Sequence, residues 1–399
     1  MIERLSISSF KCFDELRLRL GALTLLTGLN SSGKSSVMQS LGILYQTISE
    51  FETSRAILLN GPAVSLGTVS DVVCNASAQR EYDFSIGLKA PDWEAVWTAG
   101  GVDFAESPFA PLLSFQIRSD RDAEFLTQGL GLEGSSGLGV FHLVPEVLPE
   151  PYADLANAIR AILEGVSYIS AERIGPRETY PTRLFGAGRD VGAQGELAPS
   201  CLLQYEDETS NEGLLIESEP AKLPKQAGAW LNFFFPGAGF EVSEIPKTNL
   251  VKLEFRSVKS GKFHRPQNVG FALSQVLPII VACLNARKGD IILIENPEIH
   301  LHPAGQSDMG YFLARAAASG VQLMVETHSD HVLNGIRRFV GERGISPERI
   351  AIHFFGDRAA EKGDLQSTVA ELLIDEKGKI SKWPAGFFDQ ISKDLLSLP

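Results

Sequence analysis

The sequence predicts an α/β fold in which a mixed or parallel sheet is flanked by helices. Three observations predict it. An apolar strand at 23–26 leads into a turn rich in glycine and serine and then into a helical pattern from 34 to about 48. After residue 255, segments that are apolar throughout alternate with helical ones, as strands covered on both faces do. From about 82 to 116, short segments alternate apolar and polar residues, which predicts an inserted antiparallel sheet.

The other elements follow in order along the chain. Expected strands are 2–8, 15–20, 167–169, 290–294, 321–325 and 350–355, and expected helices are 149–165, 271–284 and 304–319. Glycine-rich stretches at 129–139 and 186–195 predict surface loops, and the last residues predict a hairpin over 368–382 and an amphipathic helix. This order predicts three regions: a core formed by 1–80 and 265–340, an inserted β-rich and helical region at 81–264, and a small α/β C-terminal segment at 341–399.

Composition narrows the class of protein. The 399 residues are 44% hydrophobic and 21% charged, and 36 basic against 49 acidic residues give a net charge of −13. Such an average surface repels nucleic acid and anionic membranes, so contact with DNA would need a local basic patch. The four cysteines lack metal-site spacing and fit a reducing compartment, and we expect a cytoplasmic protein. The N-terminus predicts a strand and not a signal peptide, and no apolar run is long enough to predict a membrane span.

The sharpest motif is the segment Gly-Leu-Asn-Ser-Ser-Gly-Lys-Ser at 28–35, which we call the phosphate loop. It matches GxxxxGK[ST] between a strand and a helix, the context in which backbone N–H groups hold nucleotide phosphates. The alternative, a plain glycine turn before a helix, is less favoured in this context. Lys34 would add a point charge, and Ser35 would be a ligand of Mg²⁺. The residues expected to bind ATP are Gly28, Leu29, Asn30, Ser31, Ser32, Gly33, Lys34, Ser35 and Ser36.

Two later strands are predicted to deliver polar groups at their carboxyl ends. The segment 291–298 places Glu295 after four apolar residues, and 323–329 places Glu326 and His328 in the same way. In an open α/β sheet this edge is where ligands bind. Glu295 would hold Mg²⁺, and His328 could donate to a γ-phosphate oxygen. Taken alone, the segment 291–298 is equally consistent with an acidic turn after a buried strand, and a histidine after a strand, such as His328, is more often structural.

Together these motifs resemble an ABC-type ATPase of the group that includes the RecF, SMC and overcoming-lysogenization-defect proteins. More narrowly, the opening at 2–14, the phosphate loop, ENPEIHLHP and ETHSDH are similar to bacterial predicted ATPases that carry the DUF3696 segment. The resemblance implies Mg²⁺ and ATP as cofactors and a homodimer or higher even oligomer that closes around the nucleotide. It also implies that Ser274, in the divergent signature 268–275, reaches the γ-phosphate bound by the other subunit.

The chain departs from that family at two places. Near 59–67, where the family's Mg²⁺-binding glutamine is expected, no glutamine stands, so we assign none. Many ABC ATPases also end the acidic strand with Asp and then Glu, whereas this chain has Glu295 and Asn296. Because Asn cannot act as a base, Glu298 and Glu326 are the remaining candidates, and we expect slow or partner-stimulated hydrolysis.

Several functions stay open at this point. The first is an ATP-dependent switch for a co-encoded effector, which could be a nuclease, in defence against phage; this rests on family analogy. A second is a nucleic-acid-binding ATPase of the DNA-repair type, and a third is an ATP-binding scaffold without significant hydrolysis. An intrinsic nuclease is not favoured, because the 68 residues after His331 (399 minus 331) hold no convincing two-metal set.

Two basic groups have no settled role. The run 252–265 contains Lys252, Arg256, Lys259, Lys262, His264 and Arg265 with two phenylalanines between them, and predicts a hairpin that turns at 260–261. It could contact DNA or RNA, although charged hairpins are more often simply solvated. In AERIGPR at 171–177, Arg173 and Arg177 could reach the nucleotide or a partner subunit, or could pair with the acidic surface.

Overall fold

The structure is a computed structural model. It describes residues 1–74, 82–122, 124–130, 139–150, 152–183, 188–356, 369–384 and 387–388. Two compact units divide the chain. Unit 1 contains Met1–Gly21, Leu26–Val166 and Ala351–Glu371, and unit 2 contains Ala22–Leu25, Ser167–Ile350 and Leu372–Pro399.

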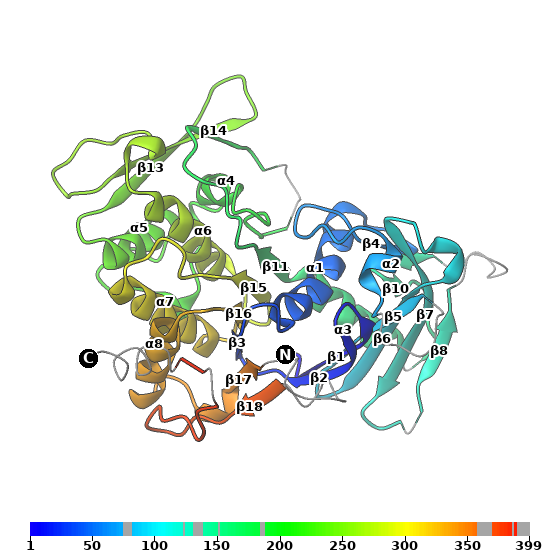
Figure 1. The fold of residues 1–399 in the computed structure, drawn as a ribbon. Helices are drawn as coiled ribbons and strands as arrows, with labels where there is room; N and C mark the ends of the chain where they lie inside the picture. The colour runs from blue at the N-terminus through cyan, green and yellow to red at the C-terminus, as the bar shows by residue number, and fades with distance from the viewer. Residues whose placement is uncertain are drawn as a thin grey trace. The chain divides into compact units, whose positions relative to one another are not determined.

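Unit 1 is built on an antiparallel sheet with the strand order β2-β1-β5-β6-β7-β4, in which β8 also pairs with β7 (Figure 1). Its strands are β1 Arg4–Phe10, β2 Phe13–Arg19, β4 Ala56–Leu58, β5 Asp83–Lys89, β6 Trp93–Gly100, β7 Phe109–Ser119 and β8 Leu126–Gly129. Alternation explains the fold of these segments: Leu5 and Ile7 of β1 are buried, whereas Ser6 and Ser8 point to the other face. The sheet therefore has one apolar and one polar face.

The remaining elements of unit 1 include the helix that follows the phosphate loop. Helix α1 (Lys34–Glu50) packs against β4 and against α3 (Tyr152–Glu164). The smaller elements are α2 Val69–Val72, η1 Val102–Phe104, β9 Val140–Phe141 and β10 Val144–Pro145. The end of β3 (Leu23–Gly28), most of β17 (Ile350–Phe355) and most of β18 (Val369–Leu372) also belong to this unit.

Unit 2 contains buried strands that alternate with helices. Strands β15 (Ile291–Glu295) and β16 (Gln322–Glu326) pair in parallel, with Glu295 in register with Glu326. The helices are α4 Ala198–Gln204, α5 Leu223–Phe234, α6 Phe271–Asn285, α7 Pro303–Ala318 and α8 Asp330–Gly341. Short 3-10 turns lie at η2 Glu212–Leu214, η3 Pro266–Asn268 and η4 Pro347–Arg349. The sheet that contains β15 and β16 has the strand order β11-β15-β16-β3-β17-β18, where β11 is Val166–Ile169.

A separate small sheet in unit 2 has the order β12-β14-β13 (Figure 1). Its strands are β12 Thr179–Pro181, β13 Gly239–Glu244 and β14 Leu250–Arg256, all antiparallel to their neighbours. Phe255, in β14, also bridges to His264, which closes the predicted turn after that strand. Near the end of the described chain, Ile374 bridges to Ile380, as the predicted C-terminal hairpin requires.

The predicted α/β class and the predicted antiparallel strands are confirmed. The antiparallel segments do not form a sheet of their own, because β5 pairs with β1 in register from Arg4 with Lys89 to Ser8 with Ser85. Helices α4, α5 and α8 and strand β13 were not predicted from the sequence. The predicted last amphipathic helix lies outside the described residues, as do most of the predicted loop at 129–139 and part of that at 186–195.

Helices α7 and α8 pack so closely that Gly310 and Gly335 have no room for a side chain. A Cβ at Gly310 would overlap the carbonyl oxygen of Val332, and one at Gly335 would overlap that of Ser307. We therefore expect Gly310→Ala to lower the free energy of unfolding by about 2–4 kcal/mol, because the helices must move apart. The matched control is Gly228→Ala in α5, where the nearest atom would be 4.0 Å away and Ala should stabilise by up to about 1 kcal/mol. Urea unfolding measures both, and equal stability of the two variants would contradict this packing.

Candidate functional site

The phosphate loop lies between β3 and α1 in unit 1. Its lysine is 3% exposed and donates from Nζ to the carbonyl oxygens of Gly28 at 3.2 Å and Leu29 at 2.5 Å. Ser32 Oγ donates to the same Leu29 oxygen at 2.6 Å. Lys34 and Ser32 thus hold the loop in a compact turn.

The conformation of this loop requires its glycines. Gly28 and Gly33 have φ angles of 134° and 107°, and Ser31 between them has 59°. Gly28 lies against Phe355, so that a Cβ there would overlap the Phe355 carbonyl oxygen, and one at Gly33 would meet the ring of Phe13. Gly33 also precedes α1 without a side-chain cap, and the positive end of the helix dipole lies at this loop. The donor set of the loop therefore fits a phosphate group.

The segment 59–67 has a structural explanation. Asn60 donates from Nδ2 to the Gly67 carbonyl at 2.8 Å and accepts from the Gly67 N–H at 2.8 Å, so it closes the loop on itself. Gln46 of α1 donates to the Leu58 carbonyl and accepts from the Val64 N–H. The buried Gln46 side chain thus fixes this loop to α1 through backbone groups.

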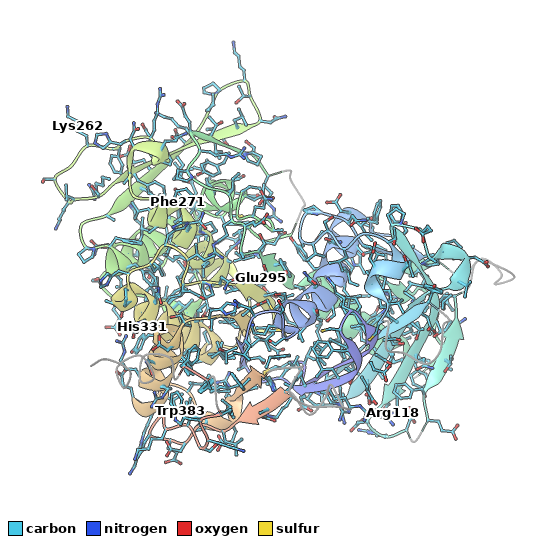
Figure 2. The ribbon with its side chains drawn as sticks, viewed as in Figure 1. Arg118, Lys262, Phe271, Glu295, His331 and Trp383 are labelled. Carbon is cyan, nitrogen blue, oxygen red and sulfur yellow. The ribbon has the colours of Figure 1, made fainter. Side chains whose placement is uncertain are left out.

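In unit 2, Glu295 lies at the end of β15 (Figure 2) with its carboxylate held by two donors. Tyr168 OH donates to Oε1, and the backbone N–H of Ala171 donates to Oε2 at 2.9 Å. Burial, and then the negative charge of Glu295, raise the pKa of Tyr168 well above its ordinary value, so its hydroxyl stays a donor at neutral pH. The carboxylate has about four acceptor positions and uses two of them here.

Arg173 secures the backbone at the same strand end. Its Nη1 donates to the carbonyl oxygens of Glu295 at 2.7 Å and Ser170 at 3.1 Å, and its Nη2 donates to that of Asn296 at 2.7 Å. The side chain is 5% exposed, and burial lowers its pKa to about 10, against the opposing attraction of Glu298 and Glu295. Arg173 therefore neither points to the acidic surface nor lies free for a ligand. Arg177, by contrast, is exposed.

Asn296 and Glu298 extend the strand end into a polar turn. Asn296 has a φ of 43°, a left-handed conformation that Asn tolerates well, and its N–H donates to the Glu326 carbonyl at 2.8 Å. Glu298 accepts from Thr327 Oγ1 at 2.8 Å and from the N–H of His328 at 2.9 Å. Both oxygens of this candidate base are thus engaged by the segment that follows β16.

The other predicted residues of unit 2 differ in accessibility. Glu326 is buried, whereas His328 is exposed. Ser274 is 5% exposed in the first turn of α6, where Phe271, 43% exposed, stands against His300 at 4.5 Å between ring centroids. For Ser274 to contact a nucleotide bound by another subunit, its hydroxyl must therefore become exposed. In unit 2 the structure brings Glu295, Glu298, Glu326 and His328 together at the ends of β15 and β16.

The turn at 170–177 connects α6 to the end of β15. Gln275 Nε2 donates to the carbonyl oxygens of Arg173 at 3.3 Å and Ile174 at 3.4 Å, and Gly175 leaves just enough room for the ring of Phe271. The sequence analysis did not single out Tyr168, Gln275 or Thr327. Gln275 ends the quoted signature segment and Thr327 stands in ETHSDH, whereas nothing in the sequence marks Tyr168.

The donor set at the end of β15 can be compared with the needs of Mg²⁺. Among the described residues, no group of three or more His, Cys, Asp or Glu side chains could hold a metal ion. Mg²⁺ is usually bound by one or two protein oxygens, by phosphates and by water. Glu295, with acceptor positions to spare, suits the protein part of such a site.

The basic run at 252–265 is partly neutralised. Lys252 pairs with Glu254 at 2.9 Å, Arg265 pairs with Glu178 at 3.2 Å, and the guanidinium of Arg256 lies 5.2 Å from the Phe263 ring. Lys262 stands in the loop after β14, where its side chain is exposed (Figure 2). Lys225, Arg256 and Lys259 line a neighbouring pocket of about 540 Å³ together with Phe233 and Phe240.

Comparison with known families identifies the class. Residues 110–334, more than half of the chain, match the family described as an AAA domain, putative AbiEii toxin, Type IV TA system, and residues 345–398 match the family described as a protein of unknown function, DUF3696. The chain therefore belongs to this AAA family and has a P-loop NTPase fold, with a DUF3696 segment at residues 345–398. No curated protein matches the chain.

Solved structures of SMC heads are similar to the chain. An SMC head bound to the C-terminal winged-helix domain of ScpA is 12% identical, with 94% of this chain and 98% of that chain covered and a TM-score of 0.48. The Pyrococcus furiosus head with an extended coiled coil, bound to the C-terminal domain of ScpA, is 11% identical, with 99% and 98% covered and a TM-score of 0.48. The Thermotoga maritima head is 9% identical, with 94% and 99% covered and a TM-score of 0.38. In the described parts of the chain, no helix has the length and apolarity to cross a membrane.

Thr327 is fully buried and orients Glu298. Its hydroxyl donates to Glu298 and accepts from the Ser329 N–H at 3.0 Å. We expect Thr327→Val to lower the free energy of unfolding by about 1–3 kcal/mol, because both partners lose a hydrogen bond inside the protein. Thr327→Ser keeps the hydroxyl and should lose less than 1 kcal/mol. Chemical denaturation separates the two, and a stable Thr327→Val variant would show that these bonds contribute little.

Proposed function

We propose that this chain is a nucleotide-driven switch that binds ATP with Mg²⁺, hydrolyses it slowly and dimerises around it to act on a partner protein. The observation that carries the proposal is the conformation of the phosphate loop. Gly28, Ser31 and Gly33 are left-handed, Lys34 is folded back onto the loop carbonyls, and the first turn of α1 has no cap. Phosphate oxygens of ATP would replace those carbonyls as the partners of Lys34.

The roles of the other residues follow from their chemistry. Ser35 and Glu295 are proposed ligands of Mg²⁺, His328 is a proposed donor to the γ-phosphate, and Ser274 is proposed to act on the nucleotide of a second copy. Glu298 and Glu326 remain the candidate bases, because Asn296 cannot accept a proton. Since Glu298 already accepts two hydrogen bonds, it is poorly placed to accept a proton without a rearrangement, and this supports slow hydrolysis.

Dimerisation and a partner complete the proposal. Because Ser274 is proposed to act on the nucleotide of a second copy, closure between two copies would complete each site. The family description names a toxin of a toxin–antitoxin system, which supports an effector or partner protein and a role in cellular or anti-phage defence. We propose that the chain acts in the cytoplasm.

Two variants test the hydrolysis step. Glu295→Gln should abolish phosphate release while the protein stays folded, because the amide binds Mg²⁺ poorly. Asn296→Glu should accelerate release severalfold, because it supplies the missing base, at a cost of about 1 kcal/mol for a left-handed residue that is not Asn. Steady-state phosphate release measures both, and brisk turnover by Glu295→Gln would refute its assignment.

The molar mass of the purified protein tests the switch. Light scattering with chromatography, with and without ATP and Mg²⁺, should show a dimer only with both. Ser35→Ala, the proposed Mg²⁺ ligand, should remain monomeric, and Ser54→Ala, a hydroxyl outside the phosphate loop, should dimerise like the unaltered chain. A mass that does not respond to ATP would leave an ATP-binding scaffold as the better description.

Nucleic-acid binding is the second candidate function, and the pocket beside the basic run favours it. Lys225, Arg256 and Lys259 meet two phenylalanines there, which is the combination that holds phosphates and stacks bases. A labelled single strand should bind in low salt and lose at least about tenfold in affinity in the double variant Lys225→Ala, Lys259→Ala. Equal binding by Lys247→Ala and by that double variant would exclude this surface.

A further inference from the structure

Charged residues line up across the polar face of the sheet in unit 1. Arg4 of β1 stands opposite Arg19 of β2 on one side and Lys89 of β5 on the other. Lys89 stands opposite Glu94 of β6, which in turn stands opposite Arg118 of β7. Four cations and one carboxylate thus share one row, in which Arg19 is already paired with Glu371 at 2.5 Å. Like charges directly opposite each other destabilise a sheet, so this row favours an added anion.

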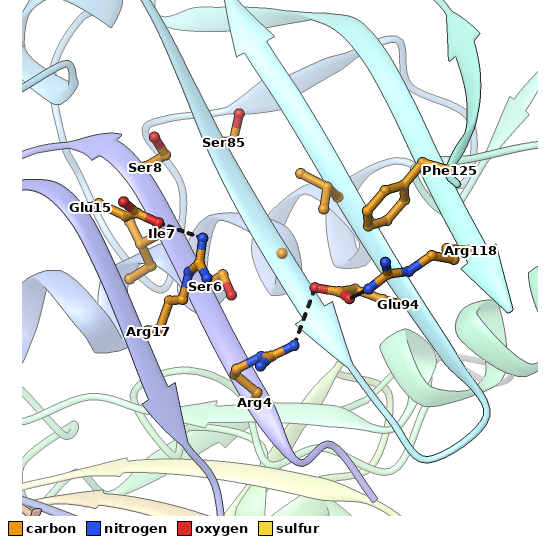
Figure 3. Close-up of a pocket in the computed structure, with 12 residues that line it drawn as sticks. Arg4, Ser6, Ile7, Ser8, Glu15, Arg17, Ser85, Glu94, Arg118 and Phe125 are labelled. Atoms are coloured by element: carbon orange, nitrogen blue, oxygen red, sulfur yellow. Dashed lines mark hydrogen bonds and ion pairs between the residues drawn. The ribbon is translucent and has the colours of Figure 1, made fainter. Parts of the chain in front are cut away.

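Next to this row the sheet is hollowed. A pocket of about 450 Å³ opens there, within the size range of small-molecule sites (Figure 3). Its floor comes from small side chains of β1 and β5, namely Ser6, Ser8, Ser85 and Gly87. Its wall carries the guanidinium groups of Arg4, Arg17 and Arg118, with Glu15 and Glu94 as the lining carboxylates. We call this hollow the sheet pocket.

Arg17 of the sheet pocket is paired with Glu15 at 2.6 Å (Figure 3), whereas Arg4 and Arg118 are oriented and keep donors to spare. Arg118 lies 4.6 Å from the ring centroid of Phe125 and 2.5 Å from Glu94, so the ring supports its guanidinium plane. Arg4 reaches Glu94 only at 3.6 Å, and among the described residues its guanidinium makes no hydrogen bond. In the same part of the chain, Lys89 has no ion-pair partner. Glu94, 15% exposed, is the one carboxylate that both Arg4 and Arg118 approach (Figure 3).

We propose that the sheet pocket binds a compact ligand that carries two or more phosphate groups. Guanidinium forks match phosphate oxygens in pairs, and Glu94 already shows that an oxyanion fits between Arg4 and Arg118. Because the chain as a whole carries a charge of −13, an anionic ligand needs such a local group of cations to bind. No residue of the phosphate loop lines the sheet pocket, so the site is separate from the proposed ATP site.

The experiment uses inorganic pyrophosphate as the probe and the full chain with Lys34→Ala, which disables the phosphate loop. Titration calorimetry should show binding in this background. Adding Arg4→Ala or Arg118→Ala should weaken it by about tenfold or more, because each removes charged donors. Adding Glu94→Gln should strengthen it severalfold, because the competing carboxylate is gone. The control Arg121→Ala removes an exposed arginine that does not line the pocket and should change nothing.

The stronger pyrophosphate binding expected for Glu94→Gln separates a binding role of the pocket from a merely structural one, because damage to the fold would only weaken binding. No pyrophosphate binding in the Lys34→Ala background, or binding that ignores Arg4 and Arg118, would overturn the proposal. Citrate in place of pyrophosphate distinguishes carboxylates from phosphates: equal affinity would overturn the assignment to phosphate. If a labelled DNA duplex bound through the same arginines more tightly than pyrophosphate, the ligand of the sheet pocket would be nucleic acid and the proposal of a compact ligand would be overturned.

Discussion

Lys34→Ala is expected to weaken ATP binding by roughly 30- to 1000-fold, which corresponds to about 2–4 kcal/mol for the charged hydrogen bonds that a phosphate would gain. In the free chain the ammonium is buried and shared between the carbonyl oxygens of Gly28 and Leu29. Exchange of these neutral acceptors for charged phosphate oxygens is the source of the affinity. A fluorescent ATP analogue, titrated in the presence of Mg²⁺, measures the loss.

The matched control for this prediction is Lys247→Ala, which removes the same charge from an exposed turn between β13 and β14. It should bind the analogue like the unaltered chain, because a distant surface charge is screened by salt. Melting temperatures of both variants, recorded without nucleotide, exclude unfolding as the reason for lost binding. Unchanged affinity in Lys34→Ala would show that ATP does not use the phosphate loop.

The sequence predicted the elements whose signal is local. The phosphate loop, α1, α6, β15, β16 and β17 all lie within a few residues of their predicted bounds, because each combines a clear apolar period with glycine or proline at its ends. Helix α5 was missed although its apolar face contains Trp230 and Leu231, since the glycine at 228 lowers the helix propensity of the segment. Strand β13 was missed because its exposed positions carry two glutamates and a serine, which read as a loop.

The site was predictable only where a residue type carries the chemistry. Glu295 was singled out because it follows four apolar residues, and His328 because it stands close to Glu326 after the next apolar strand; the roles of both stay predictions. The contacts of Glu295 could not be predicted from the sequence. Tyr168 lies 127 positions away, and the second donor is a backbone N–H, which leaves no pattern in the residue types. Asn296 shows the same limit. In the sequence, Asn296 indicated only that the usual catalytic base is absent. In the structure, its left-handed backbone explains why Asn in particular is accommodated there.

Arg173 is the clearest case in which the sequence indicated a cationic donor but not the groups to which it donates. The sequence offered the nucleotide, another subunit or surface carboxylates, and the structure shows three backbone carbonyls instead. Backbone acceptors leave no pattern in a sequence, and the separation of 122 positions from Glu295 hides the contact further. AERIGPR is therefore a structural element in unit 2, in which Arg173 fixes the end of β15 and Gln275 fixes the turn to α6.

Arg173→Ala is expected to lower the free energy of unfolding by about 3–5 kcal/mol. The carbonyls of Glu295, Asn296 and Ser170 lose their donor in a buried place, and each buried acceptor left unpaired costs about 1–3 kcal/mol. Release of the buried charge offsets part of this loss: the pKa of Arg173, lowered to about 10, shows that burial outweighs the attraction of nearby Glu298 and Glu295. The stability of Arg173→Lys should lie between that of Arg173→Ala and that of the unaltered chain, because one ammonium group cannot reproduce the planar guanidinium fork.

The control is Arg177→Ala in the same turn, since that side chain is exposed and should change the free energy of unfolding by less than about 0.5 kcal/mol. Urea unfolding followed by circular dichroism compares the three variants. Hydrogen exchange then shows where stability is lost. The N–H of Ala171 donates to Glu295, and it should exchange faster in Arg173→Ala because the end of β15 is no longer held. Equal stability of Arg173→Ala and Arg177→Ala would mean that the fork does not secure the strand end, and the turn would then be a surface loop with no hold on Glu295.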